Sequence, residues 1–343
     1  MFDNLKILSQ IDGFSGREEK VREKITELVK PFAEKITVDN LGNLIVYKKG
    51  EKRAKNKLLI CAHMDQPCLM VTGATPEGYL RTAKVGELDN ALLAGKQYLI
   101  GDSKIPAVIG CPPVHLTEKE NRRKPLKTTE LLLDIGARDE KEALSSVFPG
   151  DRVSFMSEAG DFGENLFKGK SLDSRSGCAI AIEMIKSTLL YDTVFVFTVQ
   201  SQTGNAGAAC ASFATKPDYA IVLQVVPAND IPSVGAEKQI SALCKGVVIS
   251  FKDNGAIYDS QAALLAINVC KEKGICHQIK TQNTDAGDAG KVQRSANGVR
   301  VVPLGLACRH HGSPSELISK SDMQAVKDIC TLLAEKISSG DAL

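Results

Sequence analysis

The stretch LLICAHMD, residues 58–65, joins an apolar run to two chemically active side chains. Its first five residues are apolar, a pattern typical of a strand that is buried on both faces. Side chains alternate along a strand, so His63 and Asp65 project from the same face at its end. A histidine that binds a metal usually donates its second ring N–H to an acceptor such as a carboxylate. The stretch therefore predicts a buried strand whose final pair would suit a metal ligand and its orienting carboxylate, although these residues alone favour a hydrogen-bonded structural histidine.

Strands and helices alternate in the sequence after residue 166. Polar residues follow several of the strand-like runs, and residues in this position of an α/β sheet commonly carry function. The alternation predicts a central sheet with helices on both faces. The expected elements are a helix at 178–190, a strand at 194–199, a helix at 207–214, a strand at 220–226, a strand at 246–251 and a helix at 261–273.

The hydrophobic pattern of the sequence changes between residues 68 and 165. Short alternating apolar stretches are broken there by Gly and Pro, with few helical patterns. This pattern indicates a β-rich domain inserted into the α/β domain. The expected domains are a discontinuous α/β domain over 1–67 and 166–343, and an inserted β-rich domain over 68–165.

A helix is expected near the start of the chain. Ser15-Gly16-Arg17-Glu18 has the sequence of a capping box, in which the first and fourth side chains each accept a backbone N–H. Apolar residues follow at helical spacing, from Val21 to Val29. The pattern predicts a long amphipathic helix over about 16–34.

Three more segments place polar residues beside apolar runs. SLDSRSG, residues 171–177, puts Asp173 where a helix opens, a position at which an aspartate is commonly a helix cap. VFVFTVQSQTG (194–204) and YAIVLQVVPAND (219–230) are strand-like runs with polar residues toward their ends. CRHHGSPSE (308–316) follows the strand-like RVVPLGLA.

In this order the segments resemble the glutamyl-aminopeptidase and tetrahedral (TET) aminopeptidase family. The resemblance extends nearly end to end, through LSQIDGFSGREEKVRE, CPPVHL, LLLDIGARDEKEA, NTDAG and SPSEL. It implies the phosphorylase/hydrolase-like sandwich of two-metal exopeptidases, whose relatives are often labelled cellulases or endoglucanases. It also implies that His63 is a ligand of one metal, that Asp65 orients it, and that Asp173 bridges two metals. The family's aspartate after Asp173 is Ser174 here.

The sequence departs from the family pattern at four further positions, where the family has its general base and three metal ligands. The family's general-base glutamate is Ser201, and the glutamate ligand after it is Gln202. The next aspartate ligand is Gln224, and the last histidine ligand falls on Gly312, next to His311. We consider His311 a possible substitute ligand if the loop shifts by one residue.

These departures predict a degenerate metal site. Two nearby divalent cations repel, and a single bridging carboxylate leaves most of their charge uncompensated in a low-dielectric pocket. Neutral amide oxygens are poor ligands for zinc or cobalt. We therefore expect no metal or a weakly bound divalent cation, where the family uses Zn or Co.

Two functional interpretations follow. The first is a non-catalytic homologue with a scaffold, peptide-binding or regulatory role, because a serine cannot replace a glutamate as general base near neutral pH. The alternative is an active aminopeptidase with a rearranged or single-metal site. Nucleophilic catalysis by Ser201 or a cysteine is disfavoured, because the chain has no GxSxG and no Ser/His/Asp spacing typical of a triad.

Composition narrows the class of protein. The net charge is +2, with acids and bases interspersed, which indicates neither a nucleic-acid nor a membrane surface. Ten cysteines without a CxxC, and no signal peptide, favour free thiols in the cytoplasm.

The family resemblance implies a homo-oligomer, with dimers building twelve-subunit assemblies through the inserted domain. We also expect a peptide ligand or an active paralogue as a partner. Asp285 in NTDAG is interpreted as a turn residue.

Overall fold

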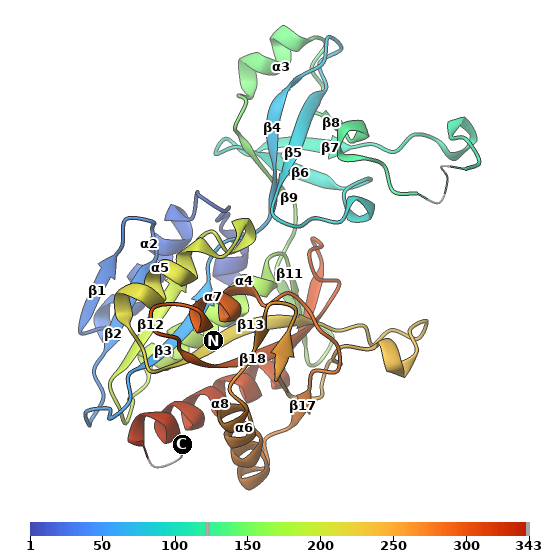
Figure 1. Cartoon of the computed structure of the whole chain (residues 1–343). Helices are drawn as coiled ribbons and strands as arrows, with labels where there is room; N and C mark the ends of the chain where they lie inside the picture. Colours follow the sequence, from blue (N-terminus) through green and yellow to red (C-terminus); the bar gives the residue numbers. More distant parts are fainter. Residues whose placement is uncertain (121, 123, 341–343) are drawn as a thin grey trace. The chain divides into compact units, whose positions relative to one another are not determined.

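The computed structural model describes residues 1–340 except 121 and 123. The chain forms two compact units (Figure 1). The larger contains Met1–Asp65, Ala159–His311 and Ser315–Leu343, and the smaller contains Gln66–Glu158 and Gly312–Pro314. Residues 159–165, expected in the inserted domain, lie in the larger unit, because they lead into a hairpin that is paired into its sheet.

The larger unit is built on a mixed sheet, the fold class expected from the sequence. Among the described residues the sheet has 11 strands, and its main path runs β1-β2-β12-β3-β13-β18-β19-β11-β10. β3, β12, β13 and β18 are mutually parallel in this path. The strands are β1 (Lys35–Val38), β2 (Leu44–Lys48), β3 (Leu58–His63), β10 (Gly160–Phe162), β11 (Leu166–Gly169), β12 (Thr193–Thr198), β13 (Tyr219–Pro227), β14 (Val247–Ile249), β17 (His277–Ile279), β18 (Arg300–Arg309) and β19 (Glu316–Ser319).

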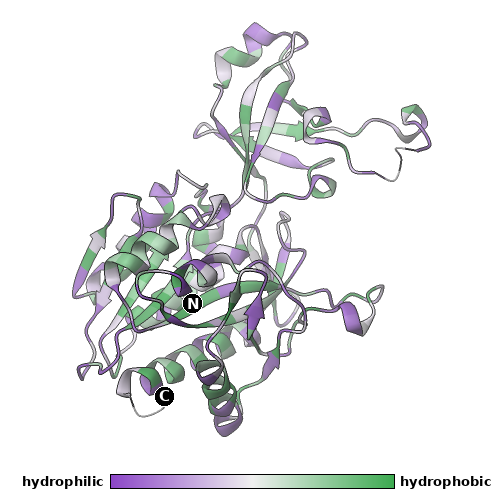
Figure 2. Cartoon of the chain, in the orientation of Figure 1, coloured by the Kyte–Doolittle hydropathy of each residue, from purple (hydrophilic) through white to green (hydrophobic). Residues whose placement is uncertain are grey.

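Helices cover both faces of this sheet (Figure 1). Alternate strand residues supply two apolar layers: Ile60 and Leu223 pack on one side, and Leu59 and Val222 on the other. The strands between the helices are correspondingly hydrophobic (Figure 2). The first layer is covered by α1 (Phe2–Gln10), α2 (Glu19–Val29), α4 (Leu172–Lys186), α6 (Ser260–Lys273) and α8 (Lys320–Ser339), and the second by α5 (Ala206–Thr215) and α7 (Gly287–Gln293). β15 (Lys252–Asp253) and β16 (Ala256–Ile257) form a separate hairpin.

The smaller unit is a closed barrel, in agreement with the β-rich domain expected from the sequence. Its strands follow the order β4-β5-β8-β7-β6-β9. They are β4 (Cys68–Ala74), β5 (Leu80–Val85), β6 (Gln97–Ile100), β7 (Ile105–Ile109), β8 (Leu133–Asp134) and β9 (Arg152–Phe155). One further helix, α3 (Glu140–Ser146), is capped by the side chain of Asp139. The barrel has its own core, in which buried Tyr98 donates a hydrogen bond to the carbonyl of Leu93.

The capping box expected at Ser15 is wrong. Helix α2 begins at Glu19 and ends at Val29, and a 3₁₀ turn follows at Lys30–Phe32. The Ser15 hydroxyl donates instead to the carboxylate of Asp65. Glu18 accepts the backbone N–H groups of Gly16 and Gln200. Ser15 and Glu18 therefore each bind a distant segment, and neither side chain caps the helix.

Two other observations bear on the class of protein. All ten cysteines are free thiols. Among the helices of the described residues, none is both long and apolar enough to cross a membrane.

Candidate functional site

The carboxyl ends of three neighbouring parallel strands carry the polar residues singled out in the sequence. His63 ends β3 and pairs in register with Thr198 at the end of β12. On the other side of β3, Val222 of β13 pairs with Cys61. Gln224 lies on β13, two residues after Val222. Because side chains alternate, His63, Thr198 and Gln224 share the sheet face that α5 and α7 cover. The topology therefore brings together residues far apart in the sequence.

Asp65 is fully buried and organises the loop after β12. Its carboxylate accepts the backbone N–H groups of Ser201 and Gln202, each at 2.9 Å, together with the Ser15 hydroxyl. Nδ1 of His63 lies 3.5 Å from Oδ1 of Asp65 and 3.2 Å from the backbone oxygen of Asp65. The aspartate therefore acts mainly as an acceptor that fixes the turn at 200–202.

The two groups also shift each other's proton affinity. Burial lowers the pKa of His63, but the hydrogen bond to Asp65 and the charges of nearby aspartates outweigh it and raise the pKa to about 9. Burial raises the pKa of Asp65, but hydrogen bonds from His63, Gln202 and Ser15 outweigh it and leave the pKa below its usual value.

The loop that would carry the family's two glutamates is a tight turn. Ser201–Thr203 form a single 3₁₀ turn, η5, between Gln200 and Asn205, which both have left-handed backbone torsions, with φ of 55° and 59°. Such torsions are uncommon for residues with a side chain. The Ser201 hydroxyl donates to Oδ1 of Asn205 at 2.8 Å. Its proton is thus held inside the loop.

Asp173 lies in the first turn of α4 and is largely buried. Its Oδ1 accepts the N–H of Ser174 at 2.7 Å, and its Oδ2 accepts Nε2 of Gln202 at 3.4 Å. Nε2 of His311 lies 3.9 Å from the same Oδ2. Asp173, Gln202 and His311 are therefore neighbours, although they are more than 25 residues apart in the sequence.

The donor set differs from that of the two-metal centre that the resemblance implies. An N–H of the Gln202 amide faces the one carboxylate that would bridge two cations, whereas a bridging site needs anionic oxygens there. Gln224 offers another neutral amide, and Gly312, which belongs to the smaller unit, has no side chain. Within the part of the chain that the structure describes, no group of three or more His, Cys, Asp or Glu side chains is arranged to hold a metal.

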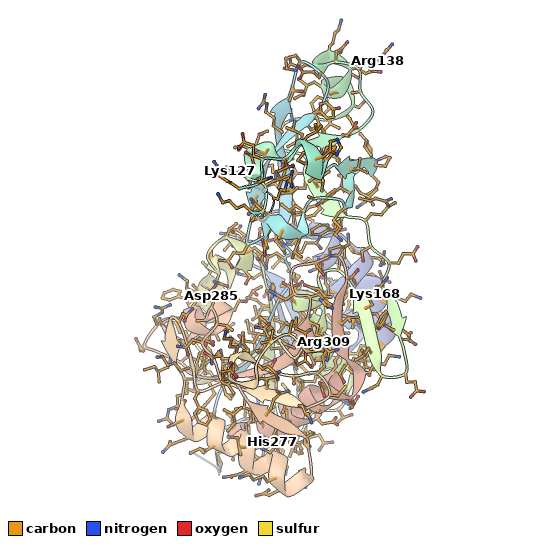
Figure 3. The ribbon with its side chains drawn as sticks, turned by 90° about the vertical axis from the view of Figure 1, so that its right-hand side faces the viewer. Lys127, Arg138, Lys168, His277, Asp285 and Arg309 are labelled. Atoms are coloured by element: carbon orange, nitrogen blue, oxygen red, sulfur yellow. The ribbon has the colours of Figure 1, made fainter. Side chains whose placement is uncertain are left out.

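A buried acid beneath the site was missed by the sequence analysis. Asp288, in the first turn of α7, accepts a hydrogen bond from the Thr198 hydroxyl at 2.5 Å, and Cys61 Sγ is 3.8 Å from the same oxygen. Its other oxygen has no hydrogen-bond partner among the described residues. Burial raises the pKa of the Asp288 carboxyl. By contrast Asp285 is exposed (Figure 3) and contacts Asn254 at 3.5 Å.

The family model and the relatives that this sequence matches are all described as aminopeptidases. The sequence model described as M42 glutamyl aminopeptidase matches residues 42–329. The chain is 35% identical over 341 residues to the "Putative aminopeptidase" of Acetivibrio thermocellus, covering 98% of both chains. It is 28% identical over 345 residues to the lysyl aminopeptidase of Pyrococcus furiosus, covering 98% of this chain and 97% of the other.

The fold also matches a solved structure. The TET1 peptidase of Pyrococcus horikoshii, described as able to assemble into a tetrahedron or a large octahedral shell, superimposes with a TM-score of 0.84. The two chains are 32% identical, and the match covers 97% of this chain and 98% of the other.

Proposed function

Because the chain belongs to the M42 glutamyl aminopeptidase family, we propose that it is a member that binds peptides without hydrolysing them. The ancestral site then serves as a recognition site within a homo-oligomer. Family membership supports the peptide as ligand, and the residues at the four departures support the loss of hydrolysis. Such a protein acts as a scaffold or regulator, with an active paralogue as a candidate partner.

The contact between Gln202 and Asp173 carries the proposal. An amide can be placed with either its nitrogen or its oxygen toward a neighbour, but an oxygen facing the carboxylate would be repelled. The N–H donor therefore neutralises part of the charge that Asp173 would otherwise present to cations. Restoring metal binding would require both a new anionic ligand and the removal of this donor.

Ser201 supports the same conclusion. A positioned general base contributes about 10²–10⁴-fold to hydrolysis, and a serine hydroxyl does not accept a proton near neutral pH. Here the hydroxyl is already donating to Asn205. The base and the ligand positions at Gln202, Gln224 and Gly312 act as one unit, so the loss of any one of them removes most of the rate, and here all four differ.

The experiment combines metal content, binding and turnover on the intact oligomer. We expect less than one equivalent of Zn, Co or Mn per chain by elemental analysis after dialysis against a chelator. A fluorescent tetrapeptide with a free α-amine should bind saturably, its N-acetylated form should bind more weakly, and neither should be cleaved. Asp173→Asn should weaken binding of the free amine. Two tight metals per chain, or cleavage of the free peptide, would refute the proposal.

The oligomer is part of the proposal. The structural neighbour from Pyrococcus horikoshii assembles into closed shells, and a homo-oligomer is consistent with this likeness. We propose that residues 68–165, expected from the sequence as the inserted domain, mediate dimerisation, and that the protein acts in the cytoplasm. Sedimentation at micromolar concentration should show an oligomer. A stable monomer would contradict the assignment.

An active aminopeptidase with a rearranged site is the second candidate. His311 favours it, since its Nε2 lies 3.9 Å from Oδ2 of Asp173 and could complete a ligand set with His63. On this hypothesis, added Co²⁺ or Zn²⁺ restores release of N-terminal residues, and His311→Ala and His63→Ala both abolish it. His310→Ala, at the exposed neighbouring histidine, is the matched control and should leave that release unchanged.

A further inference from the structure

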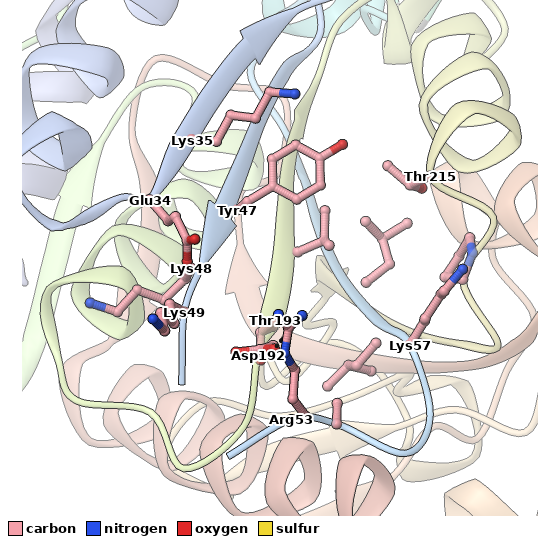
Figure 4. Close-up of a pocket in the computed structure, with 15 residues that line it drawn as sticks. Glu34, Lys35, Tyr47, Lys48, Lys49, Arg53, Lys57, Asp192, Thr193 and Thr215 are labelled. Carbon is pink, nitrogen blue, oxygen red and sulfur yellow. Dashed lines mark ion pairs between the residues drawn. The ribbon is translucent and has the colours of Figure 1, made fainter. Parts of the chain in front are cut away.

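A separate cavity, shown in Figure 4, is lined by residues at the starts of β3 and β12, whereas the candidate site lies where these strands end. Its volume is about 520 Å³, within the range of cavities that hold small molecules. Leu58 and Leu59 begin β3 here, and Val194 lies near the start of β12. His63 and Thr198 end the same two strands at the candidate site. The cavity is therefore distinct from that site.

The floor of the cavity is apolar. Leu58 and Leu59 are almost completely buried, and Ala54, Val194 and Pro217 complete the apolar lining. Tyr47, on the neighbouring strand β2, presents a partly exposed ring to the cavity (Figure 4). A ligand with an apolar or aromatic body would cover the exposed part of the Tyr47 ring and the partly exposed Ala54 and Val194.

Cations dominate the rim. Five basic side chains line the cavity, against two acids, Glu34 and Asp192. Asp192 is already engaged, since Oδ1 accepts the N–H of Gly50 and Oδ2 lies 3.6 Å from Arg53. The basic residues are Lys35, Lys48, Lys49, Arg53 and Lys57.

The amines are not neutralised by neighbouring carboxylates. Lys48 Nζ donates to the carbonyl of Phe32, and Lys35 Nζ lies 5.7 Å from the centre of the Tyr47 ring. Neither Lys49 nor Lys57 makes an ion pair with any described residue. Exposed lysines are ordinary when scattered over a surface, but these surround one apolar cavity. Their combined field attracts an anion to it.

We propose that this cavity binds a small organic anion, a carboxylate or phosphate monoester on an apolar or aromatic body. The body lies on Tyr47, Ala54 and Val194, and the anionic group faces the amines of Lys48, Lys49 and Lys57. This assignment is independent of the peptide-binding proposal, because none of these residues belongs to the candidate site.

Calorimetric titration of the intact oligomer tests the proposal with phenyl phosphate and benzoate as probes. At least one should bind saturably with one site per chain, and the two arms distinguish phosphate from carboxylate recognition. Inorganic phosphate and benzyl alcohol each carry half of the recognition and should bind at least about tenfold more weakly, a difference of about 1.4 kcal/mol. Binding should weaken as salt is raised, because the contacts are electrostatic.

Variants separate the charge from the shape of the cavity. Lys49→Met/Lys57→Met should weaken binding about tenfold or more, whereas Lys271→Met, at an exposed lysine on α6, should not change it. Thr215→Trp fills the cavity without altering charge and should also abolish binding. Thermal melting checks that each variant is folded. The proposal is overturned if neither probe binds, if benzyl alcohol binds as well as the anions, or if the cavity variants bind like Lys271→Met.

Discussion

Replacing Asp65 with alanine should destabilise the larger unit strongly, whether or not the site has any chemistry left. The side chain has no exposure to solvent, and it accepts hydrogen bonds from Ser201 N, Gln202 N and the Ser15 hydroxyl. Alanine leaves all three donors without this acceptor. It also removes the charge beside His63.

The structure sets the size of the effect. Each hydrogen bond to a charged group contributes about 1.5–3 kcal/mol, but Ser201 and Gln202 are partly exposed and water replaces some of the loss. We therefore expect Asp65→Ala to cost about 3–5 kcal/mol, as for other changes that break a buried polar network. Asp65→Asn keeps one acceptor oxygen and should cost about half as much.

Asp39 provides a matched control. Its carboxylate accepts three backbone N–H groups, those of Leu41, Gly42 and Asn43, but in a partly exposed turn. Asp39→Ala should cost only about 1–2 kcal/mol. Urea unfolding followed by circular dichroism, at one fixed protomer concentration, measures all three variants. A cost for Asp65→Ala below about 1 kcal/mol, or below that of Asp39→Ala, would refute the reasoning.

Three further outcomes are expected. Because burial raises the pKa of Asp288, its contribution to stability is present at low pH and is lost as pH rises from the unfolded-state pKa of about 3.9 through the folded-state value. Asp288→Asn should therefore be more stable than wild type by about 1–2 kcal/mol at pH 8. A stability difference that does not shrink toward pH 4 in urea unfolding would contradict this. Gly246 has φ of +80°, and an added Cβ would collide with the carbonyl of Cys276, so Gly246→Ala should lower stability by at least about 2 kcal/mol, against about 1 kcal/mol for the uncrowded Gly274→Ala in the same assay. Ser201→Glu alone should restore no peptide cleavage, which chromatography of the products measures, because the base and the ligands act as one unit.

The sequence predicted the parallel strands at the centre of the sheet, but not its edge strands β1, β10 and β17 or the strands β11 and β19. Its apolar runs are long and bounded by polar residues, so the strand expected at 220–226 is observed at Tyr219–Pro227. The ends of these strands also located His63 and Gln202 near one another, because parallel strands place their carboxyl ends at one edge.

The errors occurred where distant contacts compete with local preferences. Ser15 and Glu18 have the spacing of a capping box, but Asp65 and the backbone of Gln200 bind them instead. Asp288 was missed because NTDAGDAG has the composition of a turn. Only its place on α7, facing Thr198, shows that the carboxyl is buried. No local pattern encodes either contact.

The order of strands in the sheet has a consequence for biosynthesis. β2 and β3 emerge early from the ribosome but are not neighbours, because β12, made about 130 residues later, lies between them. In the nascent amino-terminal segment, β2 and β3 therefore each have an unpaired edge until β12 is made. The strands of the barrel lie within one continuous stretch, so the barrel can close first. Slow translation before residue 193 would lengthen the time for which those edges are open to aggregation. Early recruitment of a chaperone to this segment would protect them.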